Sequence, residues 1–453
     1  MLACGVPLPT EPALSALPAC MDSTAVLEAA RDRLHRVDPA ERECWREARL
    51  IEALYHPGRY ARMVYALLRN PATPTDRAWP EEQLLALFTP LRATMSRRGD
   101  VLRIAGHDVE AYCFPNDRRL RGLRTFARRD RVLETWRSWS GGSGEQVDED
   151  TLQRKLVRYV PEQKCVVRVR AEWSSTTGGA VVTRRVAVRS SPTAGCQRLE
   201  RRHRQVCGRV GGGASGFVVP GVVGFNPRRG LLALEWLRGD TLVEALRRGD
   251  EFEVMTRVVR ALREFHGMTI PDLAELTGVG LVNSVADALT DLTATCPDLH
   301  EPLSILAEGL PRGLAGMESG PPVTLHNDLH GNQVTVKKNR VAILDLERLA
   351  VGAADIDVAN LATQLHMLGV RPDHDVDAVT ADRWRGALLA CWKDASRCEW
   401  NPARFHLLAA RSRLELARGI LRHLRPWWQP FVAECVTRAV DDLIRAASRE
   451  EVA

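Results

Sequence analysis

Two nearby runs of sequence decide the fold. The first is Leu325-His326-Asn327-Asp328-Leu329-His330-Gly331-Asn332-Gln333-Val334, and the second is Val341-Ala342-Ile343-Leu344-Asp345-Leu346-Glu347. Each part is a short apolar run with a carboxylate, and the polar turn Lys337-Lys338-Asn339-Arg340 lies between them. This pattern predicts a small hairpin that presents Asp328 and Asp345 near one point. Two carboxylates with an amide between them are suited to holding Mg²⁺ while a hydroxyl is directed onto a nucleotide phosphate.

Length and composition describe a globular protein with more than one structural unit. The chain has 453 residues, of which 45% are hydrophobic and 26% are charged. This length exceeds what one core usually supports, so two or three units are expected. No apolar run approaches the length of a membrane span. The N-terminus has no basic region followed by an apolar core. We therefore expect a cytoplasmic protein without a membrane partner.

Cysteine spacing and charge argue against two further classes of site. The 11 cysteines are scattered singly, with no CxxC pair, so reduced and mostly buried thiols are expected. The formal net charge is +6, and arginines crowd at Arg118-Arg119, Arg121, Arg124 and Arg128-Arg129. No interleaved aromatic residues or nucleic-acid motif accompany them. A solvated face is favoured over a polyanion site, and no nucleic-acid partner is expected.

The first 140 residues are expected to form a leader and an extension. Residues 1–22 are rich in Pro and Ala, which predicts a disordered leader, and residues 23–140 are expected to be a mainly helical extension or cap. Residues 100–114 read as a hairpin, and Ser140-Gly141-Gly142-Ser143-Gly144 as a linker. The expected helices cover residues 23–34, 48–54, 60–68, 80–91 and 131–139.

A β-rich region, residues 150–238, is expected after the linker. Alternating segments at 155–160, 165–170 and 180–189 predict an antiparallel meander, and a basic helix follows at 197–206. Gly211 to Gly216 formally matches GxGxxG, but a helix precedes it and a strand follows it. The match is therefore read as a connector and not as a dinucleotide fingerprint. Residues 239–453 are expected to be mainly helical.

A β-rich lobe, one connecting strand and a larger helical lobe bearing His-x-Asp and a later Asp form the layout of a kinase. The chain resembles the aminoglycoside phosphotransferase/choline kinase-like phosphotransferases, within the protein-kinase-like fold. The resemblance covers about residues 150–450. It implies an α+β, two-lobe fold with a small antiparallel β lobe and a larger helical lobe. The stretches that carry it are Leu234–Leu242, Ala261–His266, His326–His330, Ile343–Glu347 and Gly352–Ala359.

The resemblance implies a role for each residue of the opening stretch. Asp328 would accept or orient the proton of the attacking hydroxyl. Asp345 would chelate the Mg²⁺ ions that bridge the nucleotide phosphates. Glu347, expected on the same strand face as Asp345, would contact metal through water or face the substrate, and a surface pair with Arg348 is an equal alternative. The residues expected to give structural or substrate support are His326, His330 and Asp357.

The second metal ligand departs from the family pattern. The family usually has Asn five positions after the catalytic Asp, and Gln333 stands there, with Asn332 one position earlier. A Gln carbonyl can coordinate Mg²⁺ as that of Asn does. Maltokinase-like members are similar in using Gln at this position, and their first strand pair is similar to residues 161–168 of this chain. Gln333 is therefore preferred, with Asn332 in reserve.

The nucleotide-binding lobe contains a second departure. Arg189 ends the third strand where a lysine would normally meet the α- and β-phosphates, and Glu200 is its expected partner. Arg also forks onto phosphate, but it does not replace Lys directly. A solvent-exposed Arg189 at a strand end is the alternative. Lys164 is a candidate for a second phosphate contact, and Glu235-Trp236-Leu237 resembles the family hinge.

The resulting expectation is an ATP- or GTP-dependent kinase with Mg²⁺ as cofactor. Its partners would be the nucleotide and a small molecule that bears a hydroxyl, such as an aminoglycoside, a sugar or a related metabolite. The alternative is a catalytically weak, kinase-like binding or regulatory protein, because Arg189 and Gln333 both depart from the family pattern. Asp328 and Asp345 are both present, which favours activity.

Overall fold

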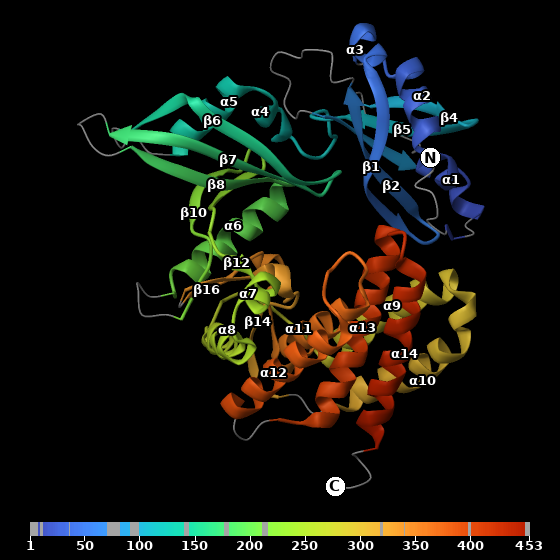
Figure 1. Ribbon diagram of the computed structural model, residues 1–453, viewed down its shortest axis with the longest axis vertical. Coiled ribbons are helices and arrows are strands. Elements are labelled where there is room, and N and C mark those ends of the chain that lie inside the picture. Colours follow the sequence, from blue (N-terminus) through green and yellow to red (C-terminus); the bar gives the residue numbers. More distant parts are fainter. Residues whose placement is uncertain are drawn as a thin grey trace. The chain divides into compact units, whose positions relative to one another are not determined.

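The chain forms two compact units in the computed structural model (Figure 1). Unit 1 comprises Met1–Arg201, Gly221–Trp236 and Arg422–Pro426. Unit 2 comprises Arg202–Pro220, Leu237–Leu421 and Trp427–Ala453. The predicted linker, residues 140–144, lies outside the described residues, and the chain on both sides of it belongs to unit 1. The described residues are 8–9, 12–35, 37–69, 82–90, 99–139, 145–175, 181–210, 216–317, 320–338, 340–396 and 400–448.

Short helices open unit 1. Asp22 accepts hydrogen bonds from the backbone N–H groups of Thr24 at 2.9 Å and Ala25 at 3.3 Å, so it caps α2, the helix predicted over residues 23–34. The expectation of a disordered leader is wrong for residues 12–21, which contain two helical turns with buried apolar side chains. The Tyr65 hydroxyl donates to Cys20 O at 2.8 Å and ties this segment to the sheet. The helices are η1 (Pro12–Leu14), α1 (Leu17–Met21), α2 (Ser23–Arg33) and α3 (Pro39–Glu43).

A five-stranded antiparallel sheet occupies most of the extension that was predicted to be mainly helical. That prediction is wrong over residues 48–54, 60–68 and 83–89, which are strands. The four side chains from Val64 to Leu67 are all buried, because this interior strand is covered on both faces. Such a run has no alternation to distinguish it from a buried helix. The strands, in the order β1-β2-β3-β5-β4, are β1 (Trp45–His56), β2 (Tyr60–Arg69), β3 (Gln83–Thr89), β4 (Asp100–Ile104) and β5 (His107–Cys113).

Two other predictions for this region are confirmed. The hairpin expected over residues 100–114 is the β4–β5 pair, which turns at Ala105 and Gly106. Gly106 has a φ of +87°, a backbone conformation that glycine adopts without strain. The helix expected over residues 131–139 is α5 (Arg129–Trp139), and the short α4 (Leu123–Ala127) precedes it.

The predicted antiparallel meander is also confirmed. Its strands β6, β7 and β8 continue into β11 and β10, and all neighbouring pairs are antiparallel. One face packs against α4 and α5 in a core that includes Trp136 and Trp173, whose ring centroids lie 5.3 Å apart. The helix α6 (Thr193–Cys207) packs through Cys196 and Leu199 against Leu232. The strands are β6 (Glu145–Val160), β7 (Lys164–Ser175), β8 (Val182–Ser190), β10 (Val222–Asn226) and β11 (Leu231–Glu235).

A buried carboxylate holds the turn between β6 and β7. Asp117 accepts hydrogen bonds from the Tyr159 hydroxyl at 3.0 Å and from Glu162 N at 2.7 Å, and also from two N–H groups of its own loop. Glu162 is buried with a φ of +62°, and its carboxylate lies 3.3 Å from Arg118 Nε. Arg62 donates to Pro161 O at 2.9 Å. The N-terminal segment therefore determines the conformation of this turn.

Replacing Asp117 by alanine should destabilise the protein. Asp117→Ala leaves the Tyr159 hydroxyl and the Glu162 N–H buried without their acceptor, which should lower the free energy of unfolding by about 2–4 kcal/mol. Urea denaturation of the full chain measures this loss. Asp108→Ala, at an exposed carboxylate on β5, is the control and should change the unfolding midpoint little. Equal stability of Asp117→Ala and wild type would contradict the proposed constraint.

Unit 2 is mainly helical, as predicted. A capping box opens its first helix, because Thr241 Oγ1 accepts from Glu244 N and the Glu244 carboxylate accepts from Thr241 N. An apolar stripe from Val254 to Phe265 forms the buried face of α8. The helices are α7 (Leu242–Arg248), α8 (Glu251–His266), α9 (Gly278–Thr295), η2 (Pro297–Leu299), α10 (His300–Gly316), α11 (Asp355–Met367), η5 (Leu368–Val370), α12 (Ala378–Ser396), α13 (Pro402–His423) and α14 (Trp428–Ala447).

Two small sheets lie among these helices. The first has the order β12-β15-β16-β9 and contains the hairpin predicted from the opening stretch. The second has the order β13-β17-β14, and β14 leads into the Asp328 loop. The strands are β9 (Phe217–Val218), β12 (Asp240–Thr241), β13 (Ala274–Glu275), β14 (Pro322–Leu325), β15 (Val334–Lys337), β16 (Arg340–Ile343) and β17 (Ala350–Ala353).

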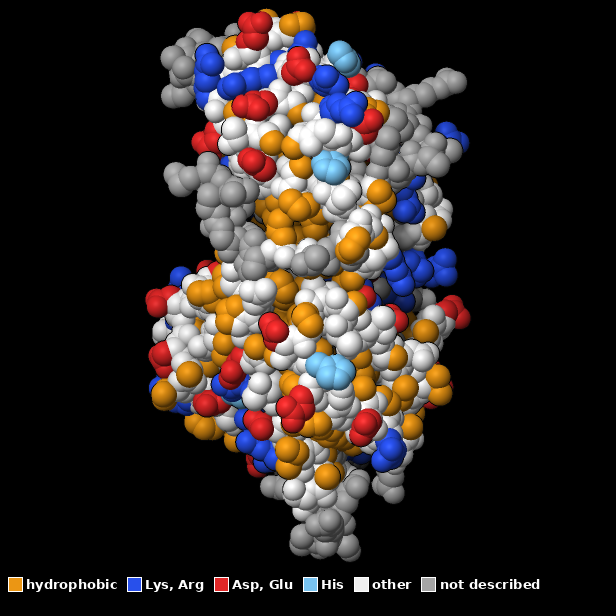
Figure 2. Space-filling model, turned by 90° about the vertical axis from the view of Figure 1, so that its right-hand side faces the viewer, with side chains coloured by type: hydrophobic (Ala, Val, Ile, Leu, Met, Phe, Trp, Pro, Cys, Tyr) orange, Lys and Arg blue, Asp and Glu red, His pale blue; other side chains and the backbone are white. Residues whose placement is uncertain are grey.

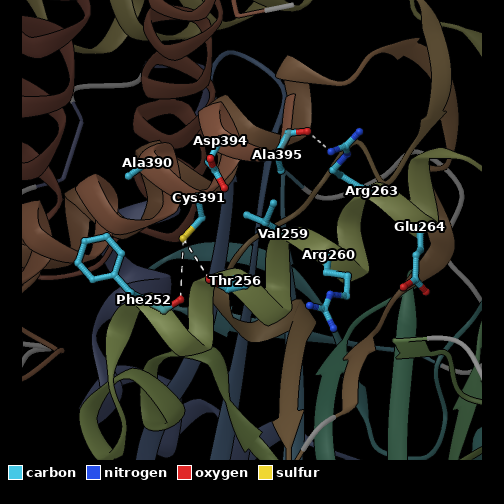
Figure 3. A pocket seen from close by; sticks show the side chains of 10 residues that line it. All are labelled: Phe252, Thr256, Val259, Arg260, Arg263, Glu264, Ala390, Cys391, Asp394 and Ala395. Atoms are coloured by element: carbon cyan, nitrogen blue, oxygen red, sulfur yellow. Dashed lines mark hydrogen bonds between the residues drawn. The ribbon is translucent and has the colours of Figure 1, made fainter. Parts of the chain in front are cut away.

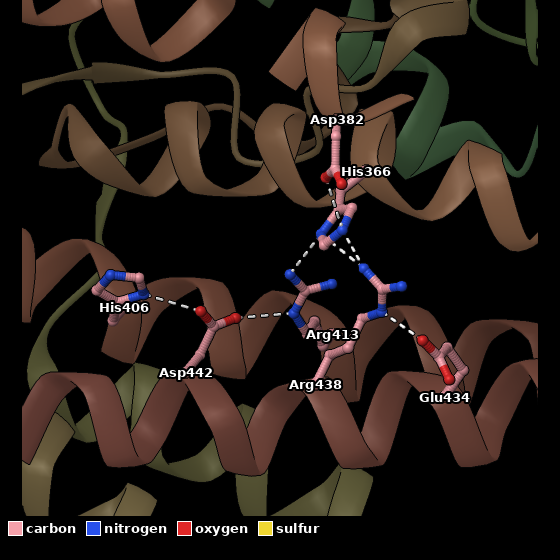
Figure 4. Close-up of polar contacts among 7 residues, drawn as sticks. All are labelled: His366, Asp382, His406, Arg413, Glu434, Arg438 and Asp442. Atoms are coloured by element: carbon pink, nitrogen blue, oxygen red, sulfur yellow. Dashed lines mark hydrogen bonds and ion pairs between the residues drawn. The ribbon is translucent and has the colours of Figure 1, made fainter. Parts of the chain in front are cut away.

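A buried polar network joins α11, α13 and α14 (Figure 4). Arg413 donates from Nε to Asp442 at 2.8 Å and approaches His366 Nδ1 at 2.9 Å. His366 Nε2 lies 3.0 Å from an Asp382 oxygen, and the Arg438 guanidinium lies against the same ring. Burial and the charges of Arg413 and Arg438 lower the pKa of His366 to about 3. The ring is therefore neutral at pH 7.

The low pKa of His366 should be visible by NMR. The ring proton signals of His366 should not shift between pH 5 and pH 8, because the imidazole stays neutral over this range. A proton NMR titration of the full chain measures the shift, and loss of one signal in His366→Gln assigns it. Titration of that signal with a midpoint near 6.5, the usual value for histidine, would contradict the effect of the neighbouring arginines.

The described residues bear on three expectations, which concern the surface charge, membrane-spanning helices and the cysteines. Basic and acidic side chains are interspersed over the described part of the face in Figure 2. Among the described helices, none combines the length and apolar character needed to cross a membrane. The described cysteines, such as Cys20 and Cys435, are free thiols, and most of them are buried.

Candidate active site

Asp328 lies in the loop between β14 and η3 (Gly331–Gln333) of unit 2. Its side chain is 42% exposed, and its carboxylate lies 4.0 Å from Arg348 Nε. Asn327, just before it, has a φ of +59°, so the backbone turns sharply before Asp328. The loop thus presents one accessible carboxylate on a fixed backbone.

Asp357, at the start of α11, holds this loop from behind. The Asp357 carboxylate is fully buried and accepts from His326 N and Asn327 N, both at 2.8 Å. His266 Nε2, at the end of α8, lies 3.0 Å from the same carboxylate. His326 Nε2 lies 2.7 Å from Leu344 O, which ties the loop to the end of β16. The two residues before Asp328 and the residue before Asp345 are therefore linked through one buried cluster.

The electrostatics of Asp357 follow from these contacts. Burial by itself raises the pKa of a carboxyl group. At Asp357 the hydrogen bond and charge of His266, together with His326, outweigh burial, and the pKa is lowered from its ordinary value. Asp357 is therefore an anion at neutral pH, and it is available to the backbone N–H groups of the loop.

Asp345 and the two candidate amide ligands, Asn332 and Gln333, flank the β15–β16 hairpin. Asp345 lies two residues after the end of β16 and has a φ of +54°. Leu344 N donates to Gln333 O at 2.8 Å, which sets Gln333 beside the residue that precedes Asp345. Asn332 N lies 3.3 Å from His330 Nδ1, and Gln333 N donates to His330 O at 2.8 Å. His330 thus supports the backbone of both candidate amide ligands.

These donors fit a magnesium ion that is shared with a nucleotide. Among the described residues, no group of three or more His, Cys, Asp and Glu side chains forms a metal cage. Mg²⁺ bound with a nucleotide needs only one or two carboxylates, because phosphate oxygens and waters complete its shell. Asp345 with the Gln333 or Asn332 carbonyl, near the Asp328 loop, is a donor set of this kind.

Glu347 is placed differently from the prediction. Residues 346–348 form the single turn η4 (Leu346–Arg348), so Glu347 does not share a strand face with Asp345. The left-handed conformation of Asp345 ends the extended chain, which the sequence pattern did not reveal. The backbone of Glu347 accepts from Arg202 NH1, and Leu349 O accepts from Arg202 NH2 at 3.4 Å.

The predicted nucleotide-binding residues belong mostly to unit 1. Arg189 on β8 pairs in register with Val166 and Leu232 and is 8% exposed, so the alternative of a solvent-exposed strand end is wrong. Glu200 lies on α6, and this helix packs against Leu232 of β11. Lys164 begins β7, directly after the turn that Asp117 holds.

The predicted hinge coincides with the passage between the two units. Glu235 ends β11, and its carboxylate accepts from Gly221 N at 3.1 Å. Trp236 N donates to Arg185 O at 3.2 Å, and the Arg168 guanidinium lies 5.3 Å from the Trp236 ring centroid. Trp236 is the last residue of this segment of unit 1, and Leu237 begins a segment of unit 2.

Three supporting residues were not predicted as site residues. His266 ends the Ala261–His266 stretch, which is one of those that carry the family resemblance, and this position could have marked it as a site residue. Asn360 Nδ2 donates to Leu329 O at 3.0 Å from α11, and Asp117 acts across a large sequence separation. No local pattern marks Asn360 or Asp117.

A cavity of about 620 Å³ in unit 2 is separate from these residues (Figure 3). It is lined by residues of α8 and α12, which include Val259 and Ala390. Cys391 Sγ lies 3.5 Å from Thr256 Oγ1 and 3.8 Å from Phe252 O, so the thiol points into α8. None of the predicted site residues lines this cavity.

Residues 184–406 match the model of a family described as the phosphotransferase enzyme family. The matched residues, which are just under half of the chain, are similar to that family. The chain is accordingly a phosphotransferase, a small-molecule kinase with an alcohol group as acceptor, and this expectation is confirmed. The α+β fold class is also confirmed, since a meander, α6, two strands and a helical unit follow one another in the order of the protein-kinase-like fold.

Solved structures of similar fold include kinases and antibiotic phosphotransferases. A choline kinase from Cryptosporidium parvum Iowa II is 10% identical with a TM-score of 0.49, covering 71% of this chain and 97% of that one. A choline/ethanolamine kinase family protein from Mesorhizobium loti is 14% identical with a TM-score of 0.46, covering 69% and 98%. A macrolide 2′-phosphotransferase from Brachybacterium faecium is 15% identical with a TM-score of 0.41, covering 69% and 98%. None of the curated proteins compared matches the chain significantly.

The buried Asp357 should make stability depend on pH. Its folded-state pKa is below the ordinary value of about 3.9, so its contribution is complete above that value and is lost as the pH falls toward the folded-state pKa. Asp357→Asn should lower the free energy of unfolding by about 2–4 kcal/mol at pH 7. The gap from wild type should narrow below about pH 4.

Urea denaturation of both proteins at pH 7, 5 and 3.5 measures this gap. Asp375→Asn, at a loop carboxylate that is not part of the Asp357 cluster, is the matched control and should follow wild type at every pH. A gap that stays constant down to pH 3.5 would show that the Asp357 charge does not stabilise the folded protein.

Proposed function

We propose that this protein transfers the γ-phosphoryl group of ATP or GTP to a hydroxyl of a small molecule, with Asp328 as the catalytic residue. The observation that supports this most directly is the contrast within one loop. The backbone before Asp328 is held by the buried Asp357, while the Asp328 carboxylate itself remains accessible. A fixed, accessible carboxylate suits a group that orients a hydroxyl and takes its proton.

Asp345 and Gln333 would hold Mg²⁺, with Asn332 as the alternative amide. The bound ion would neutralise charge on the nucleotide phosphates. The chain would position these ligands through its backbone. The hydrogen bond from Leu344 N to Gln333 O joins Gln333 to the residue before Asp345, and His330 accepts from the backbone N–H groups of Asn332 and Gln333. Gln333 in place of Asn is also the feature that resembles maltokinase-like members of the family.

Unit 1 would bind the nucleotide. Arg189 would contact phosphate oxygens with Glu200 as its partner, and Lys164 would add a contact from the turn. The buried position of Arg189 on the central strand β8 supports this role over a purely solvated one. Glu235, Trp236 and Leu237 would contact the base, because they lie where the chain leaves β11.

The acceptor is proposed to be an uncharged hydroxyl compound, such as a sugar, and not a polycation. Among the acidic residues of unit 2 that could attract an aminoglycoside, Asp355, Asp373 and Asp377 already have partners. Asp355 is buried against Arg404 at 2.6 Å, and Asp373 pairs with Arg371 at 2.8 Å. The Asp377 carboxylate accepts from Thr380 N at 2.8 Å at the start of α12. Glu347 remains a candidate for contact with substrate.

Substitution of Asp328 should separate binding from chemistry. Asp328→Asn should lower the turnover number by roughly 10²–10⁴-fold, because the amide cannot accept the hydroxyl proton. It should leave the thermal shift with nucleotide and Mg²⁺ unchanged. Asp345→Asn should instead remove the part of that shift that depends on Mg²⁺. Asp375→Asn is the charge-matched control and should retain both the turnover number and the Mg²⁺-dependent thermal shift of wild type.

The measurement is a phosphate-transfer screen of the purified chain over sugars, amino alcohols and aminoglycosides, with ATP and GTP in parallel. An unchanged turnover number in Asp328→Asn would contradict the assignment of Asp328 as the catalytic residue. The alternative, a weakly active kinase-like binding protein, is favoured by Arg189 in the usual lysine position. It would be supported by Mg²⁺-dependent nucleotide binding without transfer to any acceptor.

A further inference from the structure

A small pocket in unit 1 is lined almost entirely by groups that attract anions. Its volume is about 300 Å³. Four arginines and two hydroxyl residues form its wall, and no acidic residue lines it. The lining residues are Arg118, Arg119, Arg121, Ser191, Pro192, Thr193 and Arg229. Three of these arginines belong to the crowded stretch that the sequence alone assigned to a solvated face.

Two glycines bring these arginines together from distant parts of the chain. A side chain at Gly122 would meet Leu231 Cδ2 at 2.4 Å and Arg229 O at 2.9 Å, so only glycine lets the Arg118–Arg121 loop close onto the β10–β11 turn. Gly230 has a φ of +63°, and a Cβ there would lie 2.2 Å from Ser191 O. Ser191 N donates to Gly230 O at 3.0 Å, which joins the end of β8 to the same turn.

The positive charge of the pocket is only partly neutralised. Arg118 Nε lies 3.3 Å from the Glu162 carboxylate, and Arg229 NH1 donates to Thr125 Oγ1 at 3.4 Å. Within the described part of the chain, Arg119 and Arg121 form no ion pair with a carboxylate. Like charges gathered in one pocket repel each other, and a bound anion would remove that repulsion.

The start of α6 adds to this field. α6 is 15 residues long, begins at Thr193 and has no acidic residue in its first turn. Its first backbone N–H groups have no acceptor within the helix, and the helix dipole is positive there. Ser191 is 5% exposed, and its buried hydroxyl lies near the Cys196 thiol but has no hydrogen-bond partner of normal geometry. An anion in the pocket would meet guanidinium groups, the helix start and this hydroxyl together.

We propose that this arginine pocket binds the phosphate group of a small phosphorylated ligand, at a site separate from the proposed nucleotide residues. Arginine forks onto phosphate oxygens with two parallel hydrogen bonds, and a helix start is a common phosphate site. A pocket of this volume admits a small ligand, whereas a nucleic acid needs a longer basic surface. Because α6 also carries Glu200, the ligand would act on the helix that supports the nucleotide-binding strand.

Isothermal calorimetry with inorganic phosphate tests the site in the full chain. The titration is done with a non-hydrolysable ATP analogue and Mg²⁺ at saturation, so that nucleotide-binding residues are occupied. Arg119→Gln/Arg121→Gln should raise the dissociation constant for phosphate at least tenfold. Both side chains are exposed, so the melting temperature without phosphate should not change. Arg128→Gln/Arg131→Gln makes the same change of charge on unit 1 and should alter the constant less than twofold.

Four outcomes would overturn the proposal. The first is an unchanged dissociation constant in Arg119→Gln/Arg121→Gln. The second is equal weakening in the Arg128→Gln/Arg131→Gln control, which would mean general electrostatic attraction. The third is loss of phosphate binding in Arg189→Met, which would assign the anion to the nucleotide residues. The fourth is preferential binding of a short RNA that depends on Arg119 and Arg121, which would make the surface a polyanion site.

Discussion

The loop that presents Asp328 depends on one buried carboxylate. Asp357 uses both of its oxygens to accept backbone N–H groups from His326 and Asn327, and His266 approaches the same group. A buried charge is tolerated only when it is paired and hydrogen-bonded, so α8, α11 and the loop are held in one arrangement. The accessible Asp328 carboxylate is positioned by residues that do not take part in the chemistry.

The same device occurs in unit 1. Asp117 accepts two N–H groups of its own loop, the Tyr159 hydroxyl and the N–H of Glu162 in the β6–β7 turn. The turn leads directly into Lys164, which is a proposed phosphate contact. Residues that precede the family-matched region, 184–406, therefore set the conformation of a turn in the sheet that is proposed to bind the nucleotide. The N-terminal sheet is part of the architecture of this lobe and not an independent appendage.

Local pattern predicted the elements whose chemistry is itself local. The β15–β16 hairpin, the meander and the helix α2 follow from alternation, turn residues and helical spacing. The strands β2 and β3 were predicted as helices, because burial on both faces removes the alternation that marks a strand. Their identity is decided by neighbours that lie far away in the sequence.

By itself, the sequence determined which residue types meet at the candidate site and the order in which they occur. Asp328, Gln333 and Asp345 stand close together in the chain, and Gln333 and Asp345 flank one short hairpin. Only the tertiary structure decided that Asp357 holds the backbone before Asp328 and that Arg189 is buried. It also decided that Arg119 and Ser191 line the same pocket. Each of these depends on contacts between segments separated by tens of residues, and no local pattern encodes such contacts.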